Sequence, residues 1–64
     1  MQLDIKKMEI AMARKQMSRK DLANHTGLSE QTINAYFQQK FQPSVLSIGK
    51  LAEALCVDVT ELID

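Results

Sequence analysis

The sequence predicts a compact, all-α domain of five short helices. The apolar residues recur every three or four positions, as on one face of a helix, rather than alternating as in a half-buried strand. Only two glycines and one proline interrupt the 64 residues. A chain of this length is also too short to divide into several domains, so we expect residues 1–64 to form one domain around one modest core.

The composition excludes several classes of protein. With 45% hydrophobic and 25% charged residues, the chain is typical of globular rather than disordered proteins. Cys56 is the single cysteine, so we expect no internal disulfide, no zinc cluster and a partly buried structural thiol. No apolar run reaches the roughly 18 residues that cross a bilayer, and the charged N-terminus is unlike a signal peptide. These features predict a cytoplasmic protein without a membrane partner.

Local signals define the first two helices. Amphipathic periodicity predicts a helix over residues 4–15. Its inner face carries Ile5, Met8 and Met12. A second helix is expected after Ser18, because Ser18 and Asp21 have the spacing of a capping box. It runs to about His25, and Gly27 supplies the permissive backbone that a sharp helix exit needs.

A third helix is expected from residue 30 to residue 38, with Ser29 as its N-cap. Ile33, Tyr36 and Phe37 share its apolar side, so both aromatic residues are predicted to lie in the core rather than to stack on a ligand. The opposite side is rich in amides and carries Glu30, Gln31, Asn34 and Gln38.

The remaining chain predicts a loop and two further helices. Residues 39–43 are expected to form the loop, because Pro43 biases the preceding residue away from helix. Ser44 can cap a fourth, strongly hydrophobic helix. Its apolar residues are Val45, Leu46, Ile48, Leu51, Ala52 and Leu55. Asp58 can cap a last short helix over residues 59–63.

The zero net charge conceals two opposed halves. Residues 1–42 hold seven Lys or Arg and four Asp or Glu, which gives +3, whereas residues 43–64 hold one and four, which gives −3. Single surface charges are usually only solvated. The charge asymmetry bears on function only in combination with the motif that the second and third helices form.

Two short helices joined by a tight glycine turn are the minimal device for placing side chains in a major groove. The run LANHTGLS over residues 22–29, followed by Ile33, resembles the helix-turn-helix of the Xre-type family, which includes the phage repressors and Cro proteins. Ala23 is small where the two helices cross, Gly27 permits the turn, and Leu28 and Ile33 hold the third helix on the core. The proline loop and the apolar fourth helix extend the resemblance over about residues 5–63. The resemblance implies a five-helix, phage-repressor-like DNA-binding domain.

Three departures from the family pattern are informative. Many members pair an Arg with a Glu where this chain has Met12 and Phe37, so we predict that Met12 contacts Phe37. Gln16 and Gln39 stand where glycines are frequent, and the loops there are expected to bend differently. Arg19 stands where a glutamine usually contacts a phosphate, and it keeps that role with a charge.

The resemblance also implies which residues meet DNA. Positions that face base edges are occupied by Glu30, Gln31, Asn34 and Ala35. Amides can pair with adenine, a carboxylate can accept from cytosine, and a methyl group can meet thymine. Positions that contact the phosphate backbone are occupied by Arg19, Lys20, Ser29, Gln38 and Lys40. These contacts set the register of the protein on the duplex rather than its sequence preference.

The leading hypothesis is a sequence-specific transcriptional regulator, a repressor that binds a palindromic operator as a homodimer and needs no cofactor or metal. The candidate dimer surface is Val57, Val59, Leu62 and Ile63, unless these residues complete the core of the monomer. The alternative is a helix-turn-helix module that binds protein, antitoxin-like or an anti-regulator, which the neutral net charge and Glu30 favour. No acid or nucleophile lies at a spacing from His25 that is typical of a catalytic site, and no other catalytic set of residues is evident. We therefore expect that the protein is not an enzyme.

Overall fold

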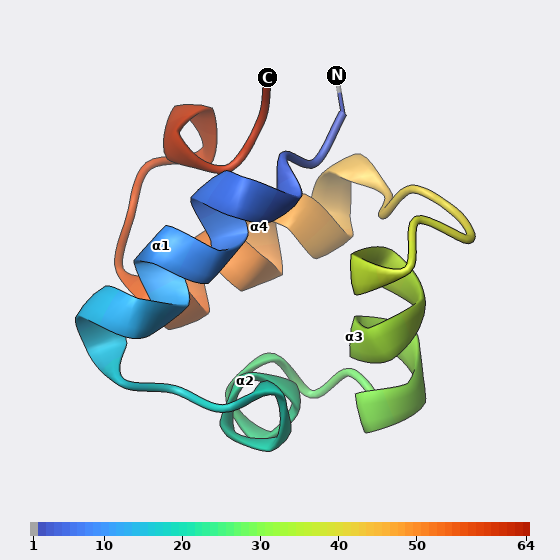
Figure 1. Ribbon diagram of the computed structural model, residues 1–64, viewed down its shortest axis with the longest axis horizontal. Coiled ribbons are helices and arrows are strands. Elements are labelled where there is room, and N and C mark those ends of the chain that lie inside the picture. Colours follow the sequence, from blue (N-terminus) through green and yellow to red (C-terminus); the bar gives the residue numbers. More distant parts are fainter. Residues whose placement is uncertain (1) are drawn as a thin grey trace.

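Four α-helices and one 3-10 turn make up the fold (Figure 1). The computed structural model describes residues 2–64. The helices are α1 (Ile5–Lys15), α2 (Arg19–Thr26), α3 (Glu30–Phe37) and α4 (Val45–Leu55), and the 3-10 turn is η1 (Val59–Glu61). The prediction of an all-α domain is confirmed. Within the described residues, no helix is long and apolar enough to cross a membrane.

The prediction of a fifth helix is wrong, because the chain after Asp58 closes only the three-residue turn η1. At Leu62 the backbone leaves the turn, and Ile63 then forms an isolated antiparallel bridge with Leu3. The amide of Asp4 donates to the carbonyl of Leu62 at 2.8 Å. Pairing with the N-terminal segment therefore takes the place of a longer helix, and the two ends of the chain lie side by side (Figure 1).

Each α-helix begins behind a side chain that caps it. Asp4, Ser18, Ser29 and Ser44 are the N-caps. The capping box of α2 is complete, since Ser18 Oγ accepts from the amide of Asp21 at 3.1 Å and the Asp21 carboxylate accepts from the amide of Ser18 at 3.0 Å. These short-range bonds satisfy amides that the first turn of a helix leaves without partners. The predicted helix starts are confirmed to within one residue.

Left-handed residues end the helices or follow them closely. Gln16, Gly27 and Cys56 are the C-caps of α1, α2 and α4, with φ of 54°, 78° and 57°. Gln39, two residues after α3, has φ of 57°. Both glutamines adopt the conformation that glycine favours, and the expectation that these loops bend differently from those of the family stays a prediction. Cys56 is exposed, so the expected partly buried thiol is wrong.

The core draws side chains from every helix and from the C-terminal segment. Its largest fully buried members are Met8, Leu22, Ile33, Leu51, Leu55 and Leu62. α4 packs against α1, α2 and η1, and so it lies at the centre of the fold. Tyr36 is buried and Phe37 packs against the core, so both predicted core positions are confirmed.

The predicted dimer surface at the C-terminus is contradicted by burial. Leu62 is 0% exposed and belongs to the core, because η1 turns its side chain inward. Val57 and Val59 pack against the same core, and Ile63 is half-buried beside Leu3. The competing interpretation, that these residues complete the core of the monomer, holds for Leu62, Val57 and Val59.

Candidate nucleic-acid interface

The turn between α2 and α3 depends on the backbone of Gly27. With φ of 78° it occupies the left-handed region, and its amide donates to the carbonyl of Ala23 at 2.9 Å. A Cβ at this position would meet no atom within 4 Å. Glycine is therefore favoured here by the backbone dihedral and not by a lack of space.

The hydroxyl of Thr26 braces the same turn. It donates to the carbonyl of Leu22 at 2.8 Å and accepts from the amide of Leu28 at 3.2 Å, so it links the last turn of α2 to the entry of α3. Thr26 is not among the residues predicted from the sequence. The signal that could have revealed it is a threonine directly before a helix-ending glycine, since threonine hydroxyls often bond to nearby backbone.

Packing fixes which side of α3 faces outward. Ala23 is 7% exposed beneath the crossing of the helices, Ile33 is 0% exposed, and Leu28 packs against the core. With Ile33 and Tyr36 turned inward, the opposite side of α3 is left to solvent. The roles that the sequence analysis gave to Ala23, Leu28 and Ile33 match this packing.

The four predicted base-contact residues lie on or beside that outer side. Glu30 and Gln31 are exposed, and Asn34 and Ala35 are half-buried. None of the four is packed in the core. The structure thus brings one carboxylate, two amides and one methyl group onto a single short helix, with functional groups that match those needed at base edges.

The five predicted phosphate-contact residues are all exposed. Ser29 is engaged as the N-cap of α3, where its Oγ accepts from the amide of Thr32 at 3.0 Å and lies 2.8 Å from the Thr32 hydroxyl. Gln38 is the C-cap of α3. Over residues 2–64 the single ion pair joins Arg14 to Glu61. Lys20 and Lys40 therefore have no carboxylate within ion-pair distance in this part of the chain.

Arg19 and Asn34, which the sequence analysis assigned to separate partners, are in contact. Arg19 Nη1 donates to Asn34 Oδ1 at 2.9 Å. The guanidinium carbon of Arg19 also lies 4.1 Å from the centroid of the Phe37 ring, within the range of a cation–π contact. The predicted contact between Met12 and Phe37 stays a prediction, although both side chains belong to the same core.

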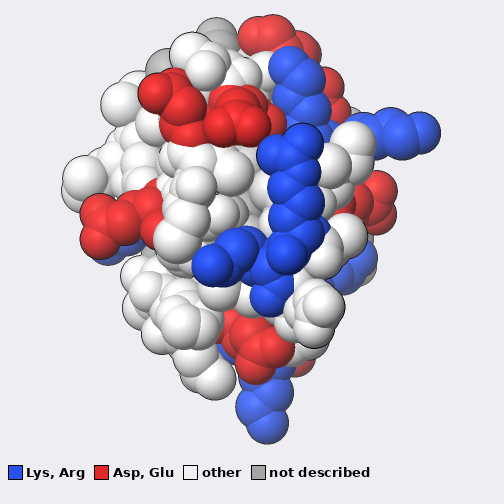
Figure 2. Space-filling view, turned by 90° about the vertical axis from the view of Figure 1, so that its left-hand side faces the viewer, with Lys and Arg blue, Asp and Glu red and all other residues white. Residues whose placement is uncertain are grey.

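The positive charge lies mostly away from α3. Of the seven basic residues in the first 42, four are on α1, namely Lys6, Lys7, Arg14 and Lys15. Figure 2, which views the side of the molecule turned away from α3 in Figure 1, shows a band of Lys and Arg. The segment made of α2, α3 and the following loop holds three basic residues (Arg19, Lys20, Lys40) and two acidic ones (Asp21, Glu30). Its net charge is therefore +1. The positive charge of residues 1–42 is therefore carried mainly by α1 rather than by the helix-turn-helix.

Hydrogen bonds lower the pKa of two carboxyl groups. The backbone amide of Ser18, followed by its hydroxyl, holds the pKa of Asp21 below its ordinary value of 3.8. The amide and hydroxyl of Thr60 do the same for Asp58. Asp21 is therefore ionised near neutral pH, and its charge lies at the helix N-terminus where it stabilises the dipole of α2.

An open groove of about 450 Å³ lies outside this interface. Its lining is Lys15, Met17, His25, Thr26, Lys50, Glu53, Ala54 and Cys56. His25 is exposed. Throughout the described residues, no three His, Cys, Asp or Glu side chains are grouped so that they could hold a metal ion.

Comparison with known proteins identifies the same motif. Residues 7–64 match the family model of the Cro/C1-type HTH DNA-binding domain. A protein from Bacteroides fragilis, assigned provisionally as DNA-binding, is 38% identical over 100% of both chains with a TM-score of 0.81. No curated protein matches the chain.

Two more distant structures share the fold alone. A hypothetical transcription factor from Neisseria is 22% identical, with a TM-score of 0.79 over 98% of this chain and 82% of that chain. A hydroxyethylphosphonate dioxygenase is also 22% identical, with a TM-score of 0.83, and this chain spans 14% of its length. At this identity the likeness concerns the arrangement of helices, and it carries no activity over.

Proposed function

We propose, from the premise that this chain belongs to the Cro/C1-type helix-turn-helix DNA-binding domains, that it places α3 in the major groove of an operator and represses transcription by occupying it. The family supports a DNA-binding regulator. The observation that supports this proposal most strongly is the division of α3 into a buried side, with Ile33 and Tyr36, and an outer side that carries polar side chains. The protein would act beside the DNA in the cytoplasm.

Four side chains of α3 are proposed to meet bases. Gln31, an exposed amide, can donate and accept at one adenine edge, and Ala35 can contact a thymine methyl group. Glu30 can accept from the amino group of cytosine, although nearby phosphates repel it. Asn34 completes the set from the middle of the helix.

Phosphate contacts are proposed at the two ends of the motif. Arg19 and Lys20 start α2, and Gln38 and Lys40 follow α3, so these side chains can grip the backbone on both sides of the groove. Ser29 is the N-cap of α3, and a phosphate could bind beside it, where backbone amides and the helix dipole favour an anion. With three cations per copy, and so six for a pair of half-sites, we expect a salt slope of about −5 for the pair.

A pair of copies is proposed to bind half-sites about 34 Å apart, one turn of duplex. Since Leu62 is in the core, the contact between copies needs another surface. Among the described residues, Phe41, Val45 and Leu46 are exposed to 51%, 72% and 72%, in the loop after α3 and at the start of α4. The Phe41 ring packs edge-on against the Tyr36 ring, with 5.4 Å between the ring centroids. Three side chains are far fewer than the roughly 20–30 residues that each partner contributes to a stable complex, so pairing would depend on DNA.

A protein-binding module remains the second candidate. The net +1 around α2 and α3 favours it, because weak phosphate attraction limits nonspecific affinity. Glu30 also favours a protein-binding module, since a carboxylate that faces the groove can accept a hydrogen bond only from cytosine and so limits the DNA sequences that the protein can bind. In that case a protein partner would cover the outer side of α3.

Selection from a random duplex library, followed by titration at two salt concentrations, distinguishes the two. Enrichment of a palindrome with half-sites one turn apart is the result expected of an operator-binding protein. Gln31→Ala should then relax preference at one base pair per half-site by about 1–3 kcal/mol. Lys20→Ala, the matched control, should weaken all sequences alike. If no sequence is enriched even at low salt, operator binding is excluded and the second candidate stands.

A further inference from the structure

The contact between Arg19 and Asn34 joins the first residue of α2 to the outer side of α3. Arg19 Nη1 lies 2.9 Å from Asn34 Oδ1, and the guanidinium carbon lies 4.1 Å from the centre of the Phe37 ring. Asn34 and Phe37 are three residues apart and so share one side of the helix. Phe37 itself packs against the core, which gives the guanidinium a fixed surface to rest on. One side chain of α2 thus holds two side chains of α3.

This contact decides which groups Asn34 can present. Arginine has N–H donors and no acceptor, so the atom that faces it must be the oxygen of the Asn34 amide. The amide NH2 group points the other way and keeps its two donors. Pairing with both groups of an adenine edge requires the oxygen and the nitrogen of an amide to face that edge together. The contact with Arg19 occupies one of the two lone pairs of the Asn34 oxygen and orients the amide toward α2, which disfavours that arrangement and leaves both N–H donors free.

The charge of the guanidinium acts in the same direction. A cation beside the reading position attracts acceptors and repels the amino group of adenine. Guanine presents two acceptors, N7 and O6, in the major groove, whereas adenine presents one acceptor and one donor. We propose that Arg19 is a positioning residue that makes Asn34 a donor, so that the base opposite Asn34 is read as guanine in preference to adenine. The inference rests on the proposed function, and it changes the role that adenine-pairing chemistry alone would give Asn34.

Arg19 retains a part in phosphate binding. Guanidinium has five N–H donors, and the contact with Asn34 uses one of them. An arginine that bridges a phosphate and Asn34 would couple the position of the backbone to the orientation of the reading side chain. Lys20, the next residue, is exposed and offers no such bridge to α3 among the hydrogen bonds of residues 2–64. It is therefore a matched control for the loss of one positive charge.

The test compares Arg19→Met with Lys20→Met on the selected site. Asn34→Ala first identifies the base pair that Asn34 reads, and four duplexes then carry each base pair at that position. We expect the native chain to prefer guanine over adenine about tenfold, and Arg19→Met to bring the two within about twofold. Lys20→Met should weaken all four duplexes and leave their ratio unchanged. In an Asn34→Ala background, Arg19→Met should no longer alter the ratio.

Each contrary result has a distinct meaning. A guanine-to-adenine ratio that survives Arg19→Met, or that still changes in the Asn34→Ala background, overturns the positioning role while operator binding stands. A native chain that selects no sequence overturns operator binding itself, and the base preference with it. A measurement without DNA separates the two: the side-chain amide resonance of Asn34 should move in Arg19→Met and stay in place in Lys20→Met. An unmoved resonance in Arg19→Met shows that the contact is absent and refutes the inference.

Discussion

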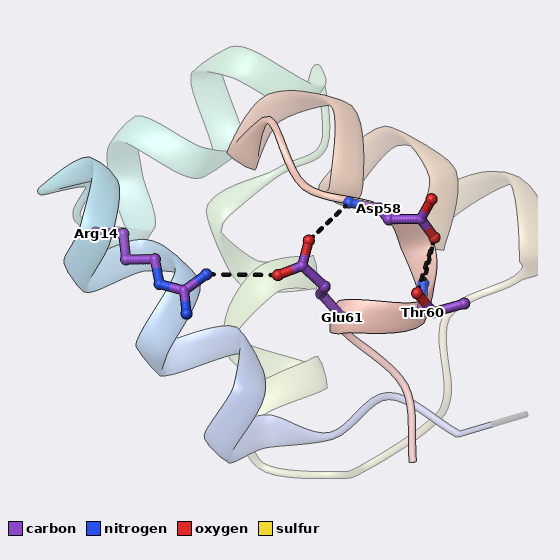
Figure 3. A network of polar contacts seen from close by, with 4 residues as sticks. All are labelled: Arg14, Asp58, Thr60 and Glu61. Atoms are coloured by element: carbon purple, nitrogen blue, oxygen red, sulfur yellow. Dashed lines mark hydrogen bonds and ion pairs between the residues drawn. The ribbon is translucent and has the colours of Figure 1, made fainter.

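Arg14 and Glu61 join α1 to the last turn of the chain, with 3.4 Å between Arg14 Nη1 and Glu61 Oε1 (Figure 3). The second carboxylate oxygen of Glu61 accepts from the amide of Asp58 at 3.3 Å, and Asp58 in turn accepts from the amide and hydroxyl of Thr60. Glu61 thus serves both an ion pair and a capping box. The ion pair is open to solvent, with side chains 64% and 50% exposed, so its attraction is screened.

Separate substitutions should therefore distinguish the two roles of Glu61. We expect Arg14→Ala to lower the free energy of unfolding by less than ~0.5 kcal/mol, because exposed ion pairs contribute little. Glu61→Ala should lower it by about 1 kcal/mol, because it also removes the acceptor of the Asp58 amide in the capping box of η1. Urea unfolding of the two variants measures the difference, and equal losses would show that the capping box contributes nothing.

Leu62→Ala should lower the free energy of unfolding by about 3 kcal/mol, since the side chain is wholly buried and its removal leaves a cavity. Ile63→Ala, at a half-buried neighbour, should lower it by less. Thermal unfolding with both variants measures this. A Leu62→Ala variant as stable as the native chain would contradict the assignment of Leu62 to the core.

Gln16→Gly and Gln39→Gly should each stabilise the protein by about 0.5–1 kcal/mol. Both glutamines have positive φ, 54° and 57°, where a Cβ is strained and glycine is not. Gln38→Gly is the control, because Gln38 has φ of −82° and glycine there only adds freedom to the unfolded chain. Denaturant midpoints should rise for the first two variants and fall for the third, and the same sign for all three would refute the argument from strain.

Val45→Ser combined with Leu46→Ser should reduce cooperative binding to a two-half-site duplex by roughly tenfold and leave binding to one half-site unchanged. The two side chains are 72% exposed, so their loss should not weaken the core. Ile10→Ser, at an exposed apolar side chain on α1, is the control. Gel-shift titrations of single and paired half-sites provide the measurement, and unchanged cooperativity would place the contact between copies elsewhere.

The stability contributed by the Asp21 carboxylate should depend on pH. Its folded pKa is depressed by hydrogen bonds from Ser18, so the contribution is fully present above the unfolded value near 3.8 and disappears as pH falls through the lower folded pKa. Asp21→Asn, which keeps an acceptor oxygen and loses the charge, should be less stable than the native chain at pH 7. The gap should close toward pH 2 in thermal unfolding, and a gap that stays constant from pH 7 to pH 2 would contradict this linkage.

The sequence by itself determined the features that neighbouring residues control. The capping box of Ser18 and Asp21, the exit at Gly27 and the inward side of α3 follow from hydrogen bonds and helical periodicity over three or four residues. Such interactions form between residues that are already close along the chain, so their spacing is visible in the sequence. The four α-helices and the helix-turn-helix could be predicted for this reason.

Only the tertiary structure decided where distant residues meet. The amide of Leu3 donates to Gln42 Oε1 at 3.0 Å across 39 positions, and Arg19 reaches Asn34 across 15. Leu62 was predicted as a contact surface and is buried, because the bridge between Ile63 and Leu3 draws the end of the chain onto the core. These outcomes depend on how the helices pack, which periodicity does not encode, and they determine the polar groups that the outer side of α3 presents.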